Sequence, residues 1–523
     1  MPSLLHDLLT QQVVKRSAKN AIGCKNHWLS YQQLAELVTQ YSYIFNALSL
    51  EKGQRVAVYL PKTFEAVISI FATSVCGGIF VPVNPVLKAR QVEHILQDCS
   101  ASILITNQAR FKLLNLKDHK NLHLVILIDG VTDNVGDKKV CNWHDLTLVK
   151  TPGNTLPDII DSDIAAIFYT SGSTGNAKGV VLNHRNLVMG AKSVSAYLPC
   201  LATDIMLAVQ PFSFDYGFSQ LTLAFLNGAS CYMEEYLFEK DLLRTIVDQK
   251  ITSLALVPPL WIKLANCQWP EQIKSQVRYF CNTGGVMPKS TLASLRQHMP
   301  NAQPYLMYGL TESFRSCYLP PEQIEQRGNS FGKAIPNAHI SVINESGHEC
   351  LPFEHGELVH RGVLVSQGYW NDDLKTAERF KIAPNTLPQV PLPEIAVWSG
   401  DIIYKDQEGY FYFVSRKDDM IKTSGYRVSP QEVEEVLFQL LNINEVIVIG
   451  IPHKELGQVL LAIIVTKQPL DEKTIIKHCK VDLPNYMLPK KIIFTESIPR
   501  NSNGKFDRRF WQNKYQNLFV QSH

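Results

Sequence analysis

Short runs of β-branched residues alternate with longer stretches of helical spacing, and this alternation limits the folds that the chain can adopt. "RVAVYLP" (55–61), "ILIT" (103–106), "LVILID" (124–129) and "IAAIFYT" (164–170) have the composition of buried strands. Between such runs lie stretches like "SYQQLAELVTQYSYIFNAL" (30–48), in which apolar residues recur at helical intervals. Strands that alternate with helices usually form mostly parallel sheets covered by helices. The sequence therefore predicts an α/β fold.

The length and a change of pattern near the C-terminus predict two domains. A chain of 523 residues is too long for one ordinary core. The prolines of "TLPQVPLPE" (386–394) suggest an extended surface loop, and Gln407–Gly409 suggests a hairpin turn. Beyond that turn the sequence predicts a small βαβ-like region of short strands and helices. We predict a large N-terminal domain of mixed and parallel sheets sandwiched by helices (1–417) and a small, mobile α+β domain (418–523).

The composition favours a soluble globular protein. Hydrophobic residues make up 45% and charged residues 19%, and 51 basic side chains are nearly balanced by 48 acidic ones. This balance gives no reason to expect nucleic acid or a membrane as the partner. The 11 cysteines show no Cys-x-x-Cys or Cys/His metal spacing, which is typical of reduced thiols in the cytoplasm.

Two further features argue against export or membrane insertion. The N-terminal residues do not combine a basic segment with a long apolar one, so no signal peptide is expected. The most apolar region, "FEAVISIFATSVCGGIFVPVNP" (64–85), is interrupted by Gly77 and Gly78. A membrane span needs about 20 uninterrupted apolar residues. We therefore predict a core helix, a glycine turn and a buried strand in this region.

The stretch "FYTSGSTGNAKGVVLNHRNL" (168–187) concentrates hydroxyl groups, glycines and a lysine after a predicted strand. Glycines let the backbone approach an anion, and hydroxyls with exposed N–H groups can bind phosphate oxygens. A flexible surface loop is the alternative. The P-loop pattern GxxxxGK[ST] does not match, because Gly179 follows Lys178. We predict a phosphate loop of another design, with these candidate residues: Thr170, Ser171, Gly172, Ser173, Thr174 and Lys178.

This loop and four later motifs resemble the adenylate-forming superfamily of acyl-CoA synthetases, peptide-synthetase adenylation domains and luciferases. The later motifs are "YGLTE" (308–312), "WSGD" (398–401), "SRKDDMIKTSGYRVSPQEVE" (415–434) and "PRNSNGK" (499–505), so the resemblance covers nearly the whole chain. It implies that a carboxylate attacks the α-phosphate of ATP, giving an acyl-adenylate and pyrophosphate. A thiol then takes the acyl group. ATP and Mg²⁺ are the implied cofactors.

The resemblance also assigns nucleotide contacts. Tyr308 would stack on adenine, close to Gly309 and the Gly284–Gly285 turn, and Thr311 would hold the α-phosphate. Glu312 would ligate Mg²⁺, a cation that prefers carboxylate and phosphate oxygens. Without the motif, Tyr308 could be a core residue and Glu312 a solvated acid.

Two residues of the later motifs would complete the nucleotide site. Asp401 would accept hydrogen bonds from the ribose hydroxyls, and Arg416 would add a contact to the nucleotide. Apart from the motif, the Asp of "SGD" could equally be a turn residue.

The last two motifs imply catalysis and domain rotation. Lys505 would reach the carboxylate and the α-phosphate and would be the main catalytic residue, together with Thr311 and Glu312. Asp418 matches the hinge about which the small domain rotates between the half-reactions. Gly425 would line the channel through which a pantetheine arm passes.

Asp215 lies among aromatic residues in "PFSFDYGFSQ" (211–220), where a carboxylate must be solvated, paired with a basic group, or available for a ligand. A buried, unpaired carboxylate would cost several kcal/mol or become protonated. In amino-acid-activating relatives a Phe-Asp pair occupies this segment, and the aspartate binds the substrate's ammonium. Arg315 could instead be the internal partner. Arg315 departs from the family pattern, and it could also bind an acidic substrate or pair with Glu312. The positions that match the acyl pocket are Asp215, Tyr216, Ser219, Cys281, Thr283, Met307, Arg315 and Ser316.

These observations lead to three hypotheses. The segments 212–217 and 307–340 are most similar to stand-alone enzymes that load L-proline onto a carrier protein and to exosortase-associated acyl-CoA ligases. We predict an ATP-dependent ligase that activates an amino acid, with L-proline as first candidate, and loads it onto the phosphopantetheine of a separate peptidyl carrier protein, as in nonribosomal peptide synthesis. The alternative is an acyl-CoA ligase that uses another carboxylic acid and free CoA. A nucleotide-binding protein without catalysis is disfavoured because the residues of the catalytic and nucleotide motifs are all present: Lys178, Glu312, Asp401 and Lys505.

Overall fold

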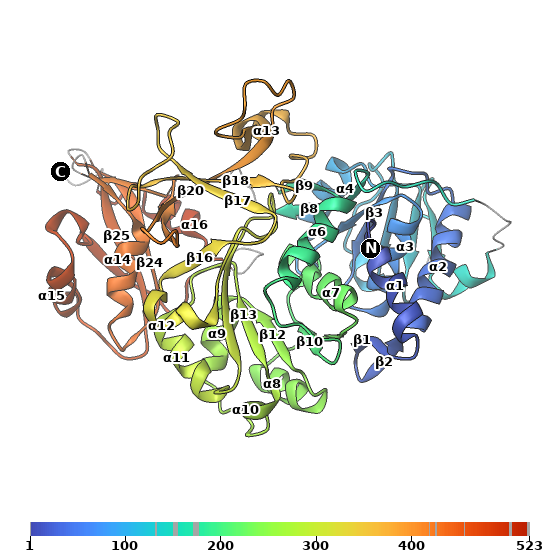
Figure 1. The fold of residues 1–523 in the computed structure, drawn as a ribbon, viewed down its shortest axis with the longest axis horizontal. Coiled ribbons are helices and arrows are strands. Elements are labelled where there is room, and N and C mark those ends of the chain that lie inside the picture. The colour runs from blue at the N-terminus through green and yellow to red at the C-terminus, as the bar shows by residue number, and fades with distance from the viewer. Residues whose placement is uncertain are drawn as a thin grey trace. The chain divides into compact units, whose positions relative to one another are not determined.

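The computed structural model describes residues 2–130, 133–149, 155–170, 177–417, 419–423, 426–453, 456–500 and 505–519 (Figure 1). The chain divides into two compact units, Met1–Ile340 with His360–Val397 and Ser341–Val359 with Trp398–His523. This division reflects how the chain packs and does not test the predicted functional boundary. That boundary, between residues 417 and 418, stays a prediction, and Asp418 lies outside the described residues.

The first sheet of the larger unit carries the predicted phosphate loop. Its seven strands have the order β7-β6-β5-β3-β4-β8-β9, and all neighbours are parallel except β8 and β9, which form a hairpin. The predicted β-branched runs form its central strands, because those strands are buried on both faces. The strands are β3 (Arg55–Tyr59), β4 (Ile79–Pro82), β5 (Ile103–Thr106), β6 (Leu124–Leu127), β7 (Lys139–Asn142), β8 (Ile164–Thr170) and β9 (Lys178–Asn183).

The second sheet of this unit supplies the predicted acyl pocket and the adenine motif. From β14 to β1 the order is β14-β13-β12-β10-β11-β1 with parallel neighbours, and β15 and β2 pair antiparallel at the two ends of this run. The strands are β1 (Asn20–Cys24), β2 (His27–Ser30), β10 (Ile205–Ala208), β11 (Ser230–Met233), β12 (Ser253–Leu256), β13 (Tyr279–Asn282), β14 (Gln303–Tyr308), β15 (Cys317–Leu319) and β16 (Ser330–Ala334). Strand β16 pairs antiparallel with β15.

Helices cover these sheets and join their strands. They are α1 (Asp7–Arg16), α2 (Tyr31–Ala47), α3 (Phe64–Val75), α4 (Ala89–Asp98), α5 (Gln108–Phe111), α6 (His184–Ser195), α7 (Asp215–Asn227), α8 (Glu239–Asp248), α9 (Pro258–Ala265), α10 (Ile273–Gln276), α11 (Lys289–His298), α12 (Ile324–Arg327) and α13 (Asp373–Arg379). Short 3₁₀ turns occupy His144–Leu148 and Pro321–Gln323. Strand β19 (Phe380–Ile382) pairs with the start of β20 (Ile395–Lys405). The helix, glycine turn and strand predicted over 64–85 are α3, Gly77 with φ +71° and β4.

Helix α7 contacts both sheets of this unit and packs against α6 (green in Figure 1). Phe218 packs on Phe80 of β4 and Phe168 of β8, with ring centroids 5.3 and 5.8 Å apart. On another face Tyr216 donates a hydrogen bond to the carbonyl of Cys281 in β13 over 3.1 Å. The first turn of α7 is thereby fixed between the two sheets, and Asp215 is its first residue.

The smaller unit contains the C-terminal elements. Its five-stranded sheet has the order β23-β22-β25-β24, with β26 paired parallel to β25, and two apolar clusters cover it. The strands of that sheet are β22 (Ile421–Thr423), β23 (Tyr426–Val428), β24 (Ile443–His453), β25 (Gly457–Thr466) and β26 (Lys491–Phe494). The helices are α14 (Pro430–Phe438), α15 (Glu472–Asp482) and α16 (Arg508–Tyr515), and a 3₁₀ turn spans Asn485–Met487.

Four further strands are hydrogen-bonded neighbours in one sheet, in the order β17 (Ala338–Ile343), β18 (Gly356–Gly362), β20 and β21 (Phe411–Arg416). The hairpin predicted at Gln407–Gly409 joins β20 to β21, with Gly409 at φ +82°. The mixed α/β fold, with a large N-terminal part built on sheets and a smaller C-terminal part, is therefore confirmed. Among the described residues, no helix has the length and apolar character needed to cross a bilayer.

Candidate active site

The β8–β9 hairpin holds both ends of the predicted phosphate loop. Thr170, the last residue of β8, pairs across the ladder with Lys178, the first residue of β9. The two ends of the loop are therefore adjacent, and Lys178 lies next to the chain that would surround a phosphate. Ser171, Gly172, Ser173 and Thr174 lie outside the described residues.

Lys178 is half-buried and lies over an aromatic ring. Its Nζ is 4.5 Å from the ring centroid of Tyr369. Burial lowers the pKa of the Lys178 ammonium, and the nearby Glu312 carboxylate acts in the opposite direction. Within the part of the chain that the structure describes, Lys178 and Glu312 form no direct ion pair. Lys178 is thus placed near a carboxylate without being neutralised by a hydrogen bond to it.

Glu312 is held by contacts to its side chain and its backbone. Tyr369 donates its hydroxyl to Glu312 Oε1 over 2.6 Å, and the Ser366 amide donates to the Glu312 carbonyl over 2.9 Å. In the part of the chain that the structure describes, no group of three or more His, Cys, Asp or Glu residues could hold a metal ion. Glu312 offers a single carboxylate, and a single carboxylate beside phosphate oxygens suits Mg²⁺.

The candidate adenine site lies at the end of β14. The Tyr308 ring packs on Phe331 of β16, with centroids 4.6 Å apart and planes tilted by 32°. A Cβ on Gly309 would lie 2.5 Å from the Phe314 carbonyl oxygen, so only glycine fits this close backbone approach. Thr311, which follows this approach, is half-buried.

The Gly284–Gly285 turn follows β13. Gly284 has φ +80°, a conformation that favours glycine. The Asn282 side chain closes the turn by donating to the Gly285 carbonyl over 3.0 Å. The turn is thus held in a conformation that favours glycine at position 284.

A pocket forms where α6 and α7 meet the second sheet. Helix α7 gives Tyr216 and Ser219, β13 gives Cys281, and the β14 region gives Met307 and Arg315. The empty space between the lining residues is about 310 Å³, including its opening. These five predicted substrate residues therefore come together, although they are far apart in the sequence.

Asp215 does not line this pocket, but it forms a buried ion pair with Arg315, which does. Their side chains are 6% and 3% exposed, and Arg315 Nη1 is 3.7 Å from Asp215 Oδ2. The guanidinium also lies 4.8 Å from the Tyr216 ring centroid, and its Nη1 donates to the Phe314 carbonyl over 2.9 Å. Arg315 Nε is buried and has no hydrogen-bond partner among the described residues. Asp215 thus has a basic partner inside the protein, which was one of the alternatives for its charge.

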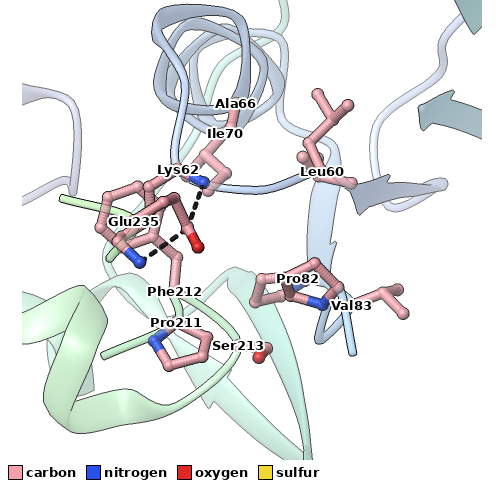
Figure 2. A pocket seen from close by; sticks show the side chains of 12 residues that line it. Leu60, Lys62, Ala66, Ile70, Pro82, Val83, Pro211, Phe212, Ser213 and Glu235 are labelled. Atoms are coloured by element: carbon pink, nitrogen blue, oxygen red, sulfur yellow. Dashed lines mark hydrogen bonds and ion pairs between the residues drawn. The ribbon is translucent and has the colours of Figure 1, made fainter. Parts of the chain in front are cut away.

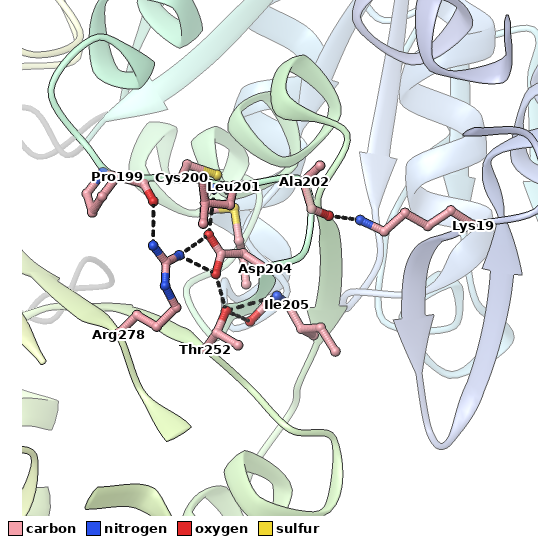
Figure 3. Close-up of polar contacts among 10 residues, drawn as sticks. Lys19, Pro199, Cys200, Leu201, Ala202, Asp204, Ile205, Thr252 and Arg278 are labelled. Carbon is pink, nitrogen blue, oxygen red and sulfur yellow. Dashed lines mark hydrogen bonds and ion pairs between the residues drawn. The ribbon is translucent and has the colours of Figure 1, made fainter. Parts of the chain in front are cut away.

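A second ion pair with a buried carboxylate shows how tightly this chain can bind a structural carboxylate (Figure 3). Arg278 Nη1 contacts both carboxylate oxygens of Asp204 at 2.6 and 2.7 Å. Thr252 and the Leu201 amide add hydrogen bonds of 2.8 and 2.7 Å to the same carboxylate. The Asp215–Arg315 separation of 3.7 Å is beyond hydrogen-bond length.

Thr283 and Ser316, the other predicted pocket residues, do not line the cavity either. Thr283 is buried in the turn after β13. Ser316 Oγ lies 2.9 Å from Nδ1 of His360, a fully buried residue whose pKa burial lowers to about 3. Ser316 therefore contacts a neutral imidazole, and its position indicates packing behind the pocket wall.

In the smaller unit, Asp401 and Arg416 face each other across β20 and β21. Arg416 Nε is 2.8 Å from Asp401 Oδ1, and the two residues are register partners. Lys505 is exposed and follows residues 501–504, which are outside the described part. The predicted hinge Asp418 and channel residue Gly425 also lie outside the described residues.

A different pocket, with about 300 Å³ of empty space including its opening, lies between β3, β4 and the segment before α7 (Figure 2). Its buried Lys62 donates to Glu235 Oε1 over 2.7 Å and to the Val209 carbonyl over 2.8 Å. None of the predicted site residues lines it. We interpret its lysine as a satisfied structural ion-pair partner.

Sequence reasoning missed Tyr369 and His360, which contact Glu312 and Ser316. Both residues lie in 360–370, a region with no motif that we used. Tyr369 follows Gly368, whose φ of +104° is a backbone conformation that favours glycine. A Gly-aromatic pair is a weak signal by itself, so there was little reason to select it from the sequence.

Two family patterns match the chain. The AMP-binding enzyme pattern covers residues 9–370, and the AMP-binding enzyme C-terminal domain covers 432–505. A long-chain-fatty-acid–CoA ligase of Escherichia coli O157:H7 is 28% identical over 97% of this chain and 93% of its own length. A linear gramicidin synthase polypeptide of Brevibacillus parabrevis is also 28% identical, over 97% of this chain but 6% of its own length.

Solved structures share the fold. ATP-bound MatB from Rhodopseudomonas palustris has a TM-score of 0.87 and 22% identity, covering 99% of this chain and 100% of MatB. The anthranilate CoA ligase AuaEII with anthranoyl-AMP has a TM-score of 0.87 and 23% identity, covering 100% of this chain and 99% of AuaEII. With the family patterns, this likeness confirms the predicted superfamily and the acid–thiol ligase class. The chain belongs to the AMP-binding enzyme family of ATP-dependent, adenylate-forming acid ligases.

Proposed function

We propose that this enzyme activates an amino acid, with L-proline as the first candidate, and transfers it to the phosphopantetheine thiol of a separate carrier protein in the cytoplasm. The observation that carries the amino-acid proposal is the buried carboxylate of Asp215, which is paired with the pocket residue Arg315. Arg315 balances its charge from 3.7 Å, too far for a hydrogen bond between them. A substrate ammonium could approach Asp215 more closely than Arg315 does.

The position of Asp215 supports this role in a second way. As the first residue of α7, it lies where the helix dipole favours a negative charge. A helix N-terminus favours a carboxylate at this position over a neutral side chain. The secondary ammonium of proline offers two N–H donors, which suits a carboxylate that has two oxygens.

The side chains around the pocket support a small or medium substrate. Apart from Arg315, the predicted substrate residues that line it are Tyr216, Ser219, Cys281 and Met307. The choice of proline among small amino acids rests on the resemblance of segments 212–217 and 307–340 to stand-alone proline-loading enzymes.

We assign the nucleotide contacts from the positions of the motif residues. Tyr308, Gly309, Gly284 and Gly285 would hold adenine, and Lys178 would bind phosphate at the end of the β8–β9 hairpin. Thr311 would contact the α-phosphate. Glu312 would hold Mg²⁺, which when bound neutralises phosphate charge during nucleophilic attack.

The smaller unit would supply the remaining groups. Asp401 would accept hydrogen bonds from ribose while Arg416 holds it in place, and Lys505 would stabilise charge at the α-phosphate. Rotation about Asp418 would then bring Gly425 to the thiol. Each of these roles can be tested by substituting the residue that carries it.

A second candidate function is an acyl-CoA ligase that activates another carboxylic acid and uses CoA. The observation that favours it is Arg315, which already gives Asp215 a counter-charge inside the protein. Relatives named as long-chain-fatty-acid–CoA ligases are consistent with it as well. In this case the pair would be structural and Asp215 would not contact the substrate.

An ATP–pyrophosphate exchange assay separates the candidates. The wild-type enzyme and Asp215→Asn are tested with the amino acids and with fatty and aryl acids. We expect exchange with L-proline and about a 100-fold loss of kcat/KM in Asp215→Asn, as for a charge-assisted contact of about 3 kcal/mol. Exchange with fatty or aryl acids and with no amino acid would refute the amino-acid proposal. Mass spectrometry of the product then distinguishes a loaded carrier protein from acyl-CoA.

A further inference from the structure

We infer that Tyr369 is a positioning residue that keeps Lys178 and Glu312 apart and aims each at its own part of Mg²⁺–ATP. Its hydroxyl binds the carboxylate of Glu312, and its ring face lies against the ammonium of Lys178. One side chain thereby contacts both charged groups assigned to the polyphosphate. This inference rests on the metal role proposed for Glu312 and is independent of the acid that the enzyme activates.

The backbone around Tyr369 is fixed to the strand that carries Lys178. The Val181 amide donates to the Gly368 carbonyl over 3.0 Å, and the Trp370 amide donates to the Gly179 carbonyl over 2.7 Å. Tyr369 itself forms a bridge with Val180. The segment 366–371 is thus attached to β9 like a short extra strand, so the ring moves with Lys178.

The same segment is attached to Glu312. The Ser366 amide donates to the Glu312 carbonyl over 2.9 Å, so the Glu312 backbone and side chain are held from the same stretch of chain. The Tyr369 ring is 6% exposed and packs edge-on against Phe380 with centroids 5.5 Å apart. Its hydroxyl therefore has little freedom to leave the carboxylate.

Electrostatics explains why such a residue is needed. An ammonium and a carboxylate in a partly buried site attract each other strongly at short range. A direct Lys178–Glu312 pair would neutralise the cation meant for phosphate and the anion meant for the metal. Tyr369 gives Glu312 a neutral hydrogen-bond donor and gives Lys178 a neutral π surface. Both charges stay available for the ligand.

Two substitutions separate the contributions of the hydroxyl and the ring. Tyr369→Phe removes the hydroxyl but keeps the ring beside Lys178 and Phe380, whereas Tyr369→Leu removes both. Binding of the non-hydrolysable analogue α,β-methylene-ATP is measured by calorimetry with the full-length protein, once with Mg²⁺ and once with EDTA. The ratio of the two affinities reports the metal contribution without any turnover.

We expect the Mg²⁺-dependent increase in affinity to be about tenfold smaller in Tyr369→Phe than in wild type. This is the typical effect of removing a partner that orients a metal ligand. The affinity of Tyr369→Phe without metal should stay within about twofold of wild type. Tyr369→Leu should also lose about three- to tenfold of the metal-free affinity, because Lys178 loses its aromatic contact. Tyr41→Phe is the matched control, since it removes a buried hydroxyl that donates to the Trp143 carbonyl away from the site.

Glu312→Gln distinguishes failure of this inference from failure of the metal assignment. If Glu312→Gln abolishes the Mg²⁺ enhancement and Tyr369→Phe retains it fully, Tyr369 does not position the carboxylate and the inference is wrong. If Tyr369→Phe loses the same factor of affinity for α,β-methylene-ATP with and without Mg²⁺, the inference is also wrong, because such a loss indicates a general structural effect. An unchanged enhancement in Glu312→Gln would remove both the metal role and the inference.

Discussion

Removing the charges of the Asp215–Arg315 pair should change the stability of the protein. The direction in which a ligand alters that change depends on what the pocket binds. Arg315→Met removes the guanidinium but keeps a long side chain, and Asp215→Asn removes the negative charge with little change of shape. At 3.7 Å, two unit charges attract by about 4 kcal/mol with an effective dielectric constant near 20. Removing one partner of a buried pair costs about 3–5 kcal/mol, because the other charge is left uncompensated. The double variant removes both charges and should be more stable than Arg315→Met.

Thermal unfolding of the four proteins measures this coupling as a double-mutant cycle. We expect Arg315→Met to lower the Tm by about 5 °C and the double variant by about 2 °C, given the small Tm shift per kcal/mol in large proteins. The cycle Asp204→Asn with Arg278→Met is the matched control, because that pair has direct hydrogen bonds. If the control cycle shows coupling while Asp215→Asn and Arg315→Met are additive, Arg315 is not the counter-charge of Asp215.

Added L-proline turns the same variants into a test of specificity. A ligand stabilises the folded protein in proportion to its binding free energy. If the substrate ammonium takes the place of the Arg315 charge, proline should raise the Tm of Arg315→Met more than that of wild type. It should not raise the Tm of Asp215→Asn. A smaller proline effect in Arg315→Met than in wild type would mean that Arg315 binds the ligand, and this would refute the displacement argument.

Other parts of the structure lead to three further predictions. Lys505→Ala should abolish exchange while leaving the affinity for α,β-methylene-ATP within about threefold of wild type; unchanged turnover would contradict its catalytic role. Burial lowers the pKa of His184 to about 4 and of His360 to about 3, so the unfolded state binds more protons once the pH falls below about 6.5. Each should therefore remove about 2 kcal/mol of stability at about pH 5, whereas a Tm profile that stays flat between about pH 7 and 5 would exclude this linkage. Gly217→Ala should give little folded protein in a circular-dichroism melt, because its Cβ would lie 2.2 Å from the Pro211 carbonyl oxygen, and a normal melt would show that this turn can move.

The central strands could be predicted from the sequence because burial on both faces requires continuous apolar runs. The runs that became β3, β5, β6 and β8 are of this kind, and their identification needed no distant contacts. The helix and strand of 64–85 were predictable for the same reason, with Gly77 marking the turn. How two sheets and α7 pack together depends on many side chains at once, so no local pattern showed it.

The pocket wall could be predicted only through the family motifs. Tyr216, Cys281 and Met307 become neighbours because parallel strands β13 and β14 bring their ends to one edge, where α7 begins. Tyr369 had no such motif. Its role arises because 366–371 pairs with β9, and an irregular extra strand carries neither alternation nor helical spacing.

The buried carboxylates of Asp204 and Asp215 differ in a way that bears on substrate choice. Asp204 is bound by a guanidinium, a hydroxyl and an amide at hydrogen-bond distances, so a ligand could add little there. Arg315 lines the pocket, lies 3.7 Å from Asp215, and has a buried Nε without a hydrogen-bond partner among the described residues. An anion on the substrate could bind this guanidinium, and an ammonium could bind the carboxylate beside it. An uncharged acyl chain could do neither, because it would have to pack against a buried ion pair. We therefore expect charge on the substrate, more than its length, to determine which acids this pocket accepts.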